Sequence, residues 1–96
     1  MSSRQTEKQI KKIISKFINA KDYKIFIFGS RAKEKARKFS DYDIGLMGKR
    51  PLSFEKMALI EDALEESDLP FRVDLIDFHS VTKEFKESVA EKIRMI

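Results

Sequence analysis

The sequence contains no cysteine and a single histidine, so two common kinds of functional site are missing from it. Without cysteine, the chain can form neither a disulfide nor a thiolate metal site. With His79 as its one histidine, it cannot build a zinc site from several histidines. A histidine-based triad would have to use His79 itself as the base, and we expect His79 to be an ordinary loop residue.

Glycine is also scarce, and long hydrophobic runs do not occur. The three glycines, Gly29, Gly45 and Gly48, form neither the G-x-x-x-x-G-K-[ST] pattern of a P-loop nor the G-x-G-x-x-G pattern of a dinucleotide site. No apolar stretch approaches the roughly 20 residues that a membrane-spanning helix needs, and the N-terminus lacks the apolar core of a signal peptide. We therefore expect a soluble, cytoplasmic protein with no membrane partner.

Charged residues are abundant by contrast. They make up 38% of the 96 residues, against roughly 25% in typical soluble domains, and the formal net charge is +4. A positive charge favours anionic partners, but this excess is small and spread along the chain, so nucleic acid is not the expected partner. The length and the hydrophobic fraction of 42% indicate one domain that spans residues 1–96.

Apolar periodicity divides the chain into alternating helices and strands. Spacings of three and four indicate helices, whereas short continuous or alternating apolar runs indicate strands. The expected order is helix Thr6–Ala20, strand Lys24–Phe28, short helix Arg31–Phe39, strand Tyr42–Met47, a helix that follows Ser53 and ends near Ser67, strand Arg72–Phe78, and a helix from Thr82 to the C-terminus. This order predicts a mixed α/β (α+β) domain, with a small sheet and helices packed on it.

Two aspartates at the start of the second predicted strand are candidate metal ligands. Asp41 and Asp43 are two residues apart, so on an extended chain they project from the same face, roughly 6.5–7 Å apart. Asp74 lies inside an otherwise apolar strand, where a charge is costly to bury unless it is paired or metal-bound. If the second and third strands are neighbours, Asp74 faces the other two, and two Mg²⁺ ions suit such a set of oxygen ligands. Asp77 falls on the opposite face and is expected at the surface or the strand end.

The segment before these aspartates has the features of a phosphate-binding turn. Gly29 permits a tight turn and a close approach of the backbone, and Ser30 can cap the short helix that follows. Amides at a helix N-terminus donate to phosphate oxygens. Basic residues follow at once, and one or two of these could bind a triphosphate: Arg31, Lys33, Lys35, Arg37 and Lys38.

Each half of this pattern has an ordinary alternative. An Asp-x-Asp sequence is common in turns, and Gly-Ser is a frequent helix entry. The combination of Gly29-Ser30, Ser40-Asp41-Tyr42-Asp43 and Asp74 is more specific, and it favours a nucleotide site.

This combination resembles the DNA polymerase beta-like nucleotidyltransferase superfamily, most closely its minimal nucleotidyltransferases. The resemblance implies the fold of that superfamily and a catalytic and metal-binding set of Asp41, Asp43 and Asp74, with Asp74 helping to activate the attacking hydroxyl. It also implies a nucleotide-binding set of Gly29, Ser30, Arg31, Arg37 and Ser40, with ATP as substrate. The family usually has glycine where this chain has Glu34.

Minimal nucleotidyltransferases often pair with small helical HEPN proteins in toxin–antitoxin modules, so the resemblance implies such a partner. The expected activity is Mg²⁺-dependent transfer of AMP onto a tyrosine hydroxyl of a HEPN toxin, in a possible homo- or hetero-oligomer. An alternative is a module that Glu34 has impaired in catalysis and that neutralises its partner by binding alone.

Overall fold

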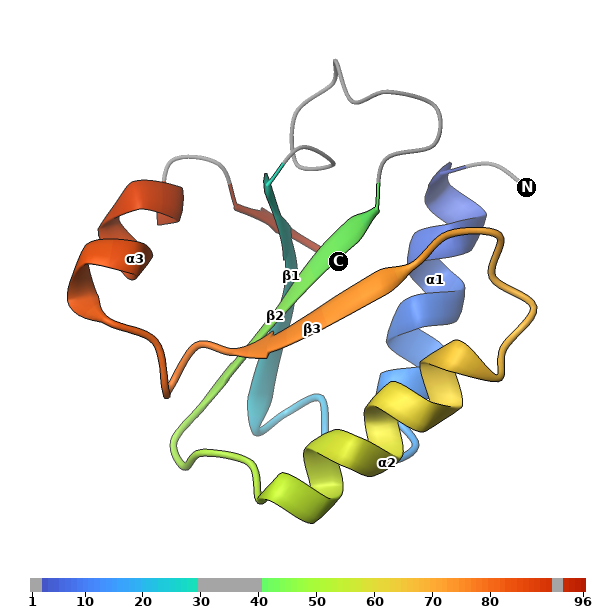
Figure 1. Cartoon of the computed structure of the whole chain (residues 1–96), viewed down its shortest axis with the longest axis horizontal. Helices are drawn as coiled ribbons and strands as arrows, with labels where there is room; N and C mark the ends of the chain where they lie inside the picture. Colours follow the sequence, from blue (N-terminus) through green and yellow to red (C-terminus); the bar gives the residue numbers. More distant parts are fainter. Residues whose placement is uncertain (1–2, 30–40, 91–92) are drawn as a thin grey trace.

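The computed structural model describes residues 3–29, 41–90 and 93–96 of the chain. Within these ranges the elements are α1 (Ser3–Ile14), β1 (Tyr23–Phe28), β2 (Tyr42–Gly48), α2 (Phe54–Glu65), β3 (Val73–Asp77), α3 (Lys83–Val89) and β4 (Arg94–Met95). The strands form one sheet in the order β3-β2-β1-β4 (Figure 1). This mixed sheet with packed helices confirms the expected α+β class.

The strand pairing is what positions the candidate site. β1 pairs antiparallel with β2 and with β4, whereas β2 pairs parallel with β3. The parallel pair is connected through α2, as a parallel connection requires a crossover. In register, Asp43 of β2 lies between Phe28 of β1 and Asp74 of β3.

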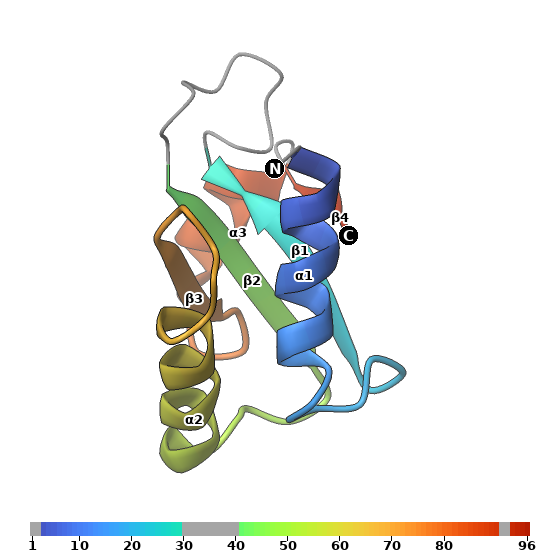
Figure 2. The same ribbon diagram turned by 90° about the vertical axis from the view of Figure 1, so that its right-hand side faces the viewer.

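Helices cover both faces of the sheet, with α1 and α2 on one side and α3 on the other (Figure 2). The α1–α2 side buries mainly aliphatic residues, including Ile10, Ile27 and Ile44, each fully buried. The α3 side buries a smaller aromatic cluster formed by Phe26, Phe28 and Phe78. Because β1 contributes to both clusters, its last four side chains, from Ile25 to Phe28, are all apolar and buried, as predicted for a strand buried on two faces.

Side chains of the preceding residues cap two of the helices. The Ser53 hydroxyl accepts a hydrogen bond from the Lys56 amide at 3.1 Å, and the Thr82 hydroxyl accepts one from the Phe85 amide at 3.1 Å. Each bond satisfies a donor that the first helical turn leaves without an intrahelical partner. The predicted starts of these two helices are therefore confirmed.

The first predicted helix is displaced towards the N-terminus in the structure. α1 begins at Ser3 and ends at Ile14, and turns continue the chain to Ile18. The predicted short helix Arg31–Phe39 lies outside the described residues.

The prediction that the last helix reaches the C-terminus is wrong. α3 ends at Val89, and the chain then pairs with the free edge of β1 as β4. Two further contacts hold this segment: the Ile96 amide donates to the Ile25 carbonyl at 3.3 Å, and Arg94 binds Glu7 of α1 at 2.6 and 2.9 Å. These tertiary bonds outweigh the local helical pattern that the sequence shows.

Among the residues that the structure describes, no helix has both the length and the apolar character needed to cross a bilayer.

Candidate active site

Asp43 and Asp74 occupy paired positions on neighbouring parallel strands, on the face of the sheet that α3 partly covers. Side chains alternate between the two faces along a strand, so Asp43 lies on the same face as Gly45 of β2, and Asp74 lies on the same face as Ile76 of β3. Ile76 packs against the aromatic cluster on this side. The structure thus brings together two carboxylates that are 31 positions apart in the sequence.

Asp41 lies immediately before β2 and is exposed. Its negative charge contributes to the raised pKa of Asp43, after burial and the charge of Asp74. The pairing of β2 with β3 confirms the predicted strand neighbourhood, and the metal-binding and catalytic roles of these three aspartates remain predictions.

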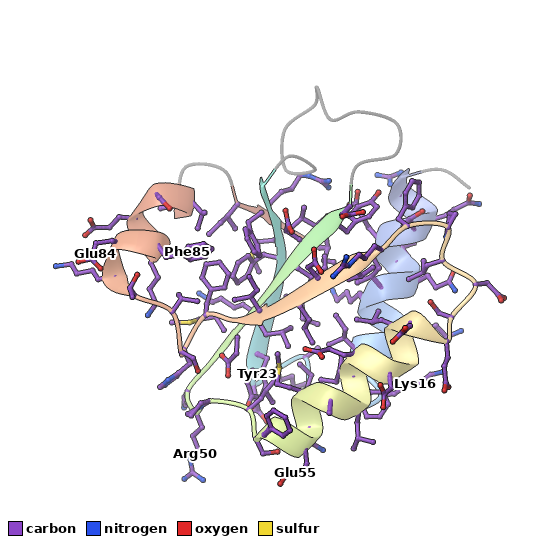
Figure 3. All side chains as sticks on the ribbon, viewed as in Figure 1. Lys16, Tyr23, Arg50, Glu55, Glu84 and Phe85 are labelled. Atoms are coloured by element: carbon purple, nitrogen blue, oxygen red, sulfur yellow. The ribbon has the colours of Figure 1, made fainter. Side chains whose placement is uncertain are left out.

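The surroundings of Asp43 disfavour its charged form. Burial has the largest effect in raising the pKa of Asp43, followed by the negative charges of Asp74 and then Asp41. Asp43 pairs with Phe28 on β1, and Phe85 of α3 packs against Phe28 with ring centroids 6.0 Å apart. Figure 3 shows the Phe85 side chain directed from α3 towards the sheet. A carboxylate held in this environment is stabilised by a nearby cation.

Gly29 closes over Asp43 at the end of β1. Its φ of +73° lies in the left-handed region, which residues with a Cβ adopt only with strain. A Cβ added at Gly29 would overlap the Oδ2 atom of Asp43 and lie 3.3 Å from its Cγ. Glycine is therefore required here for two reasons, since the backbone φ is positive and the Asp43 carboxylate occupies the place that a Cβ would take.

An arginine that the sequence analysis did not single out pairs with Asp74. The Arg72 Nε lies 3.3 Å from Asp74 Oδ1, and the side chains are 77% and 42% exposed. Exposed pairs of this kind are weak and readily rearrange when another charged group binds. The sequence could have indicated this pair, because Arg72 and Asp74 are two residues apart and side chains at that spacing in a strand project from one face.

Asp77 ends β3 on the opposite face from Asp74, so the strand-end alternative of the prediction is confirmed. The side chain is buried, which excludes the surface alternative. Its carboxylate accepts hydrogen bonds from the Leu52 amide at 2.8 Å and from the His79 amide at 2.9 Å. Asp77 therefore ties the loop before α2 to the end of β3, and its role is structural.

The other predicted nucleotide-binding residues, Ser30, Arg31, Arg37 and Ser40, lie outside the described residues, as does Glu34. Within 3–29, 41–90 and 93–96, no group of three or more His, Cys, Asp or Glu side chains is close enough together to hold a metal ion. Asp43 and Asp74 still fit Mg²⁺, which typically takes only one or two protein carboxylates and completes its shell with substrate phosphates and water.

Residues 8–96 match the family model described as "Polymerase beta, Nucleotidyltransferase". The chain is also 43% identical over 68 residues to a Haemophilus influenzae protein named "Probable protein adenylyltransferase MntA". That match covers 71% of this chain and spans 60% of the length of the relative.

Solved structures share the fold. One, from Shewanella oneidensis, is a tri-AMPylated HEPN toxin in complex with MNT antitoxin, with a TM-score of 0.75 and 23% identity over 98% of this chain and 71% of that one. Another is a toxin-antitoxin with AMP-PNP, with a TM-score of 0.76 and 26% identity over 93% of this chain and 70% of that one.

Proposed function

Because this chain belongs to the polymerase beta nucleotidyltransferase family, we propose that it transfers AMP from ATP onto a hydroxyl group of a partner protein. The observation that carries this proposal is the register pairing of Asp43 with Asp74, directly beneath Gly29. The H. influenzae relative carries the name of a protein adenylyltransferase, which supports the choice of a protein as acceptor.

Asp41, Asp43 and Asp74 would hold two Mg²⁺ ions together with the triphosphate oxygens. When bound, Mg²⁺ neutralises charge on the phosphates and on the leaving group. The raised pKa of Asp43 is consistent with this role, since a cation between the carboxylates would relieve the repulsion that raises it. Gly29 would let the triphosphate approach the backbone, with Ser30, Arg31, Arg37 and Ser40 as further contacts.

The reaction exchanges a phosphoanhydride bond of ATP for a phosphoester bond to the acceptor. The acceptor hydroxyl oxygen bonds to the α-phosphorus of ATP, the bond from that phosphorus to the bridging oxygen of the β-phosphate breaks, and pyrophosphate leaves. In this proposal Asp74 accepts the hydroxyl proton; the 42% exposure of its side chain supports this role, since the carboxylate can be reached from outside the sheet. Arg72 holds the Asp74 carboxylate before the acceptor arrives.

The partner we propose is a HEPN toxin, modified on a tyrosine, so that the chain acts as an antitoxin. The structural neighbours support this choice, since one is a tri-AMPylated HEPN toxin in complex with MNT antitoxin. The reaction would take place in the cytoplasm, where ATP is available.

The direct test is transfer of label. The chain is incubated with [α-³²P]ATP, Mg²⁺ and a helical HEPN protein, and the HEPN protein should become labelled. Asp41→Asn should lose the transfer, and Asp62→Asn, which removes a charge from the exposed side of α2, should keep it. Absence of transfer, with Asp41→Asn indistinguishable from wild type, would contradict the proposal.

The second candidate is neutralisation by binding alone, with Glu34 in place of the usual glycine. Calorimetry separates the two, because a functional site releases heat on binding Mg²⁺-ATP and an impaired one does not. A HEPN protein that binds without becoming labelled, together with no heat from Mg²⁺-ATP, would favour this second function.

A further inference from the structure

The outer edge of β3 has no strand partner within the described residues. On the inner side, the Tyr42 amide donates to the Arg72 carbonyl at 2.9 Å, so the backbone of Arg72 faces β2. Backbone groups alternate along a strand, so those of Val73 and Leu75 face outward. An edge of this kind can accept an additional strand.

A groove of about 830 Å³ follows this edge on the side of α2 and reaches the candidate active site. Its lining combines apolar side chains with four carboxylates and one basic residue: Leu64, Leu69 and Phe71, then Asp43, Glu61, Glu65 and Asp74, and Arg72. A chain bound along it would therefore meet an apolar surface and a net negative charge.

A second groove of about 500 Å³ continues in the same direction and shares Glu61, Leu75 and Ile76 with the first. Phe54, at the start of α2, lines it and is 86% exposed. Full exposure of a phenylalanine is unfavourable in water, and a bound chain would cover it. The two grooves together run along the whole of β3.

We propose that this edge binds an extended, basic segment of the acceptor protein as an additional strand, which presents its hydroxyl-bearing residue to Asp74. The inference rests on the proposed function and names how its acceptor is recognised. Side chains of a strand alternate between faces, so one set lies on the side of Asp43 and Asp74 and the neighbouring set enters the groove beside α2. A lysine or arginine among the side chains that enter the groove beside α2 would pair with Glu61 and Glu65.

The charge of the groove argues against a second copy of this chain as the occupant. Pairing of two β3 edges would place Glu61 and Glu65 of both copies on the same side of a joined sheet. Like charges opposed in this way are destabilising, whereas a basic segment is attracted.

The test uses the full chain without nucleotide and two fluorescein-labelled peptides, Ser-Leu-Tyr-Lys-Ser and Ser-Lys-Tyr-Leu-Ser, which cover both strand directions. At least one should bind saturably by fluorescence anisotropy. Val73→Pro removes an outward amide at the first residue of an edge strand, where proline is tolerated, and should bind about tenfold more weakly than the isosteric Val73→Thr. Glu61→Lys combined with Glu65→Lys should weaken binding, and Asp62→Lys on the same helix should not.

A measurement independent of protein folding uses peptides N-methylated on alternate amides. One methylation pattern should abolish binding and the other should preserve it, because only alternate amides of a strand face its neighbour. Absence of saturable binding, equal affinity of the two Val73 variants, or equal effects of the two methylation patterns would overturn the proposal. So would a dimer in solution that Val73→Pro dissociates.

The two proposals fail separately in this design. Peptide binding needs neither ATP nor Mg²⁺, so loss of AMP transfer with intact peptide binding contradicts the proposed function and not the edge site. Intact transfer to the HEPN protein by Val73→Pro contradicts the edge site alone.

Discussion

The two faces of the sheet differ in how completely they are covered. The α1–α2 face is closed, with Ile10 and Ile14 of α1 and Ile60 of α2 fully buried. The α3 face is covered by a shorter helix that has no fully buried residue, and it leaves Asp43 and Asp74 partly accessible. The two faces therefore differ in function as well as packing in our proposal: the closed face buries the aliphatic core, and the open face leaves the two carboxylates accessible.

Adjacent residues of β2 point to opposite faces of the sheet, so substituting them one at a time tests each face separately. Asp43→Asn should reduce AMP transfer about a thousandfold, because it removes a charge from the proposed metal site, while the protein stays folded. The measurement is the transfer rate together with circular dichroism. Asp62→Asn serves as the control, and near-normal transfer by Asp43→Asn would contradict the assignment.

Ile44→Ala changes the next residue, which is fully buried on the closed face. It should lower the free energy of unfolding by about 2–5 kcal/mol, since it removes buried methylenes and leaves a cavity. Transfer per folded molecule should change little. Denaturant unfolding measures the first quantity, and a loss of transfer without a loss of stability would show that the two faces are not separate.

Gly29→Ala tests the contact at the end of β1. The positive φ costs roughly 1 kcal/mol or more, and the added Cβ would displace the Asp43 carboxylate, so we expect both lower stability and weaker Mg²⁺-ATP binding. A double-mutant cycle with Asp43→Ala is the control, because removing that carboxylate should reduce the penalty. Additive effects would show that the overlap is unimportant.

The smallest expected effect is on stability as a function of pH without divalent ions. The pKa of Asp43 is raised above its ordinary value in the folded protein, so the folded state binds its proton more tightly than the unfolded state does. Protonated Asp43 therefore adds to the free energy of unfolding. This added stability is fully present at pH values below the unfolded pKa and is lost as the pH rises through the raised folded pKa. Unfolding experiments between about pH 4 and 8 should show this loss in wild type and its absence in Asp43→Asn. Equal pH profiles would contradict the carboxylate coupling.

Local patterns predicted the strands well. Alternation in residues 72–78 correctly separated Val73 and Leu75 from Asp74 and Ile76, and the continuous run before Gly29 correctly indicated a strand buried on both faces. The aspartates were recognisable because a charge in an apolar strand is unusual. Their metal-binding role remains a prediction.

Other features depend on contacts that no local pattern contains. The helical spacing of Phe85, Val89, Ile93 and Ile96 continues past the end of α3, yet the chain leaves the helix because β1 offers an open edge. For Asp77 the pattern left open the surface or the strand end; the folded chain buries it at the strand end, where the amides of Leu52 and His79 satisfy its carboxylate.

Local alternation already specifies which residues share a face, because side-chain direction along a strand has a fixed period. Three features arise only on folding: Asp43 lies beside Asp74, Gly29 contacts the Asp43 carboxylate, and the edge of β3 opens into a groove. These depend on strand order and register, which are set by packing between distant segments and by where the polar backbone groups find partners. The sequence therefore indicated the carboxylates, and the sheet decided how they meet.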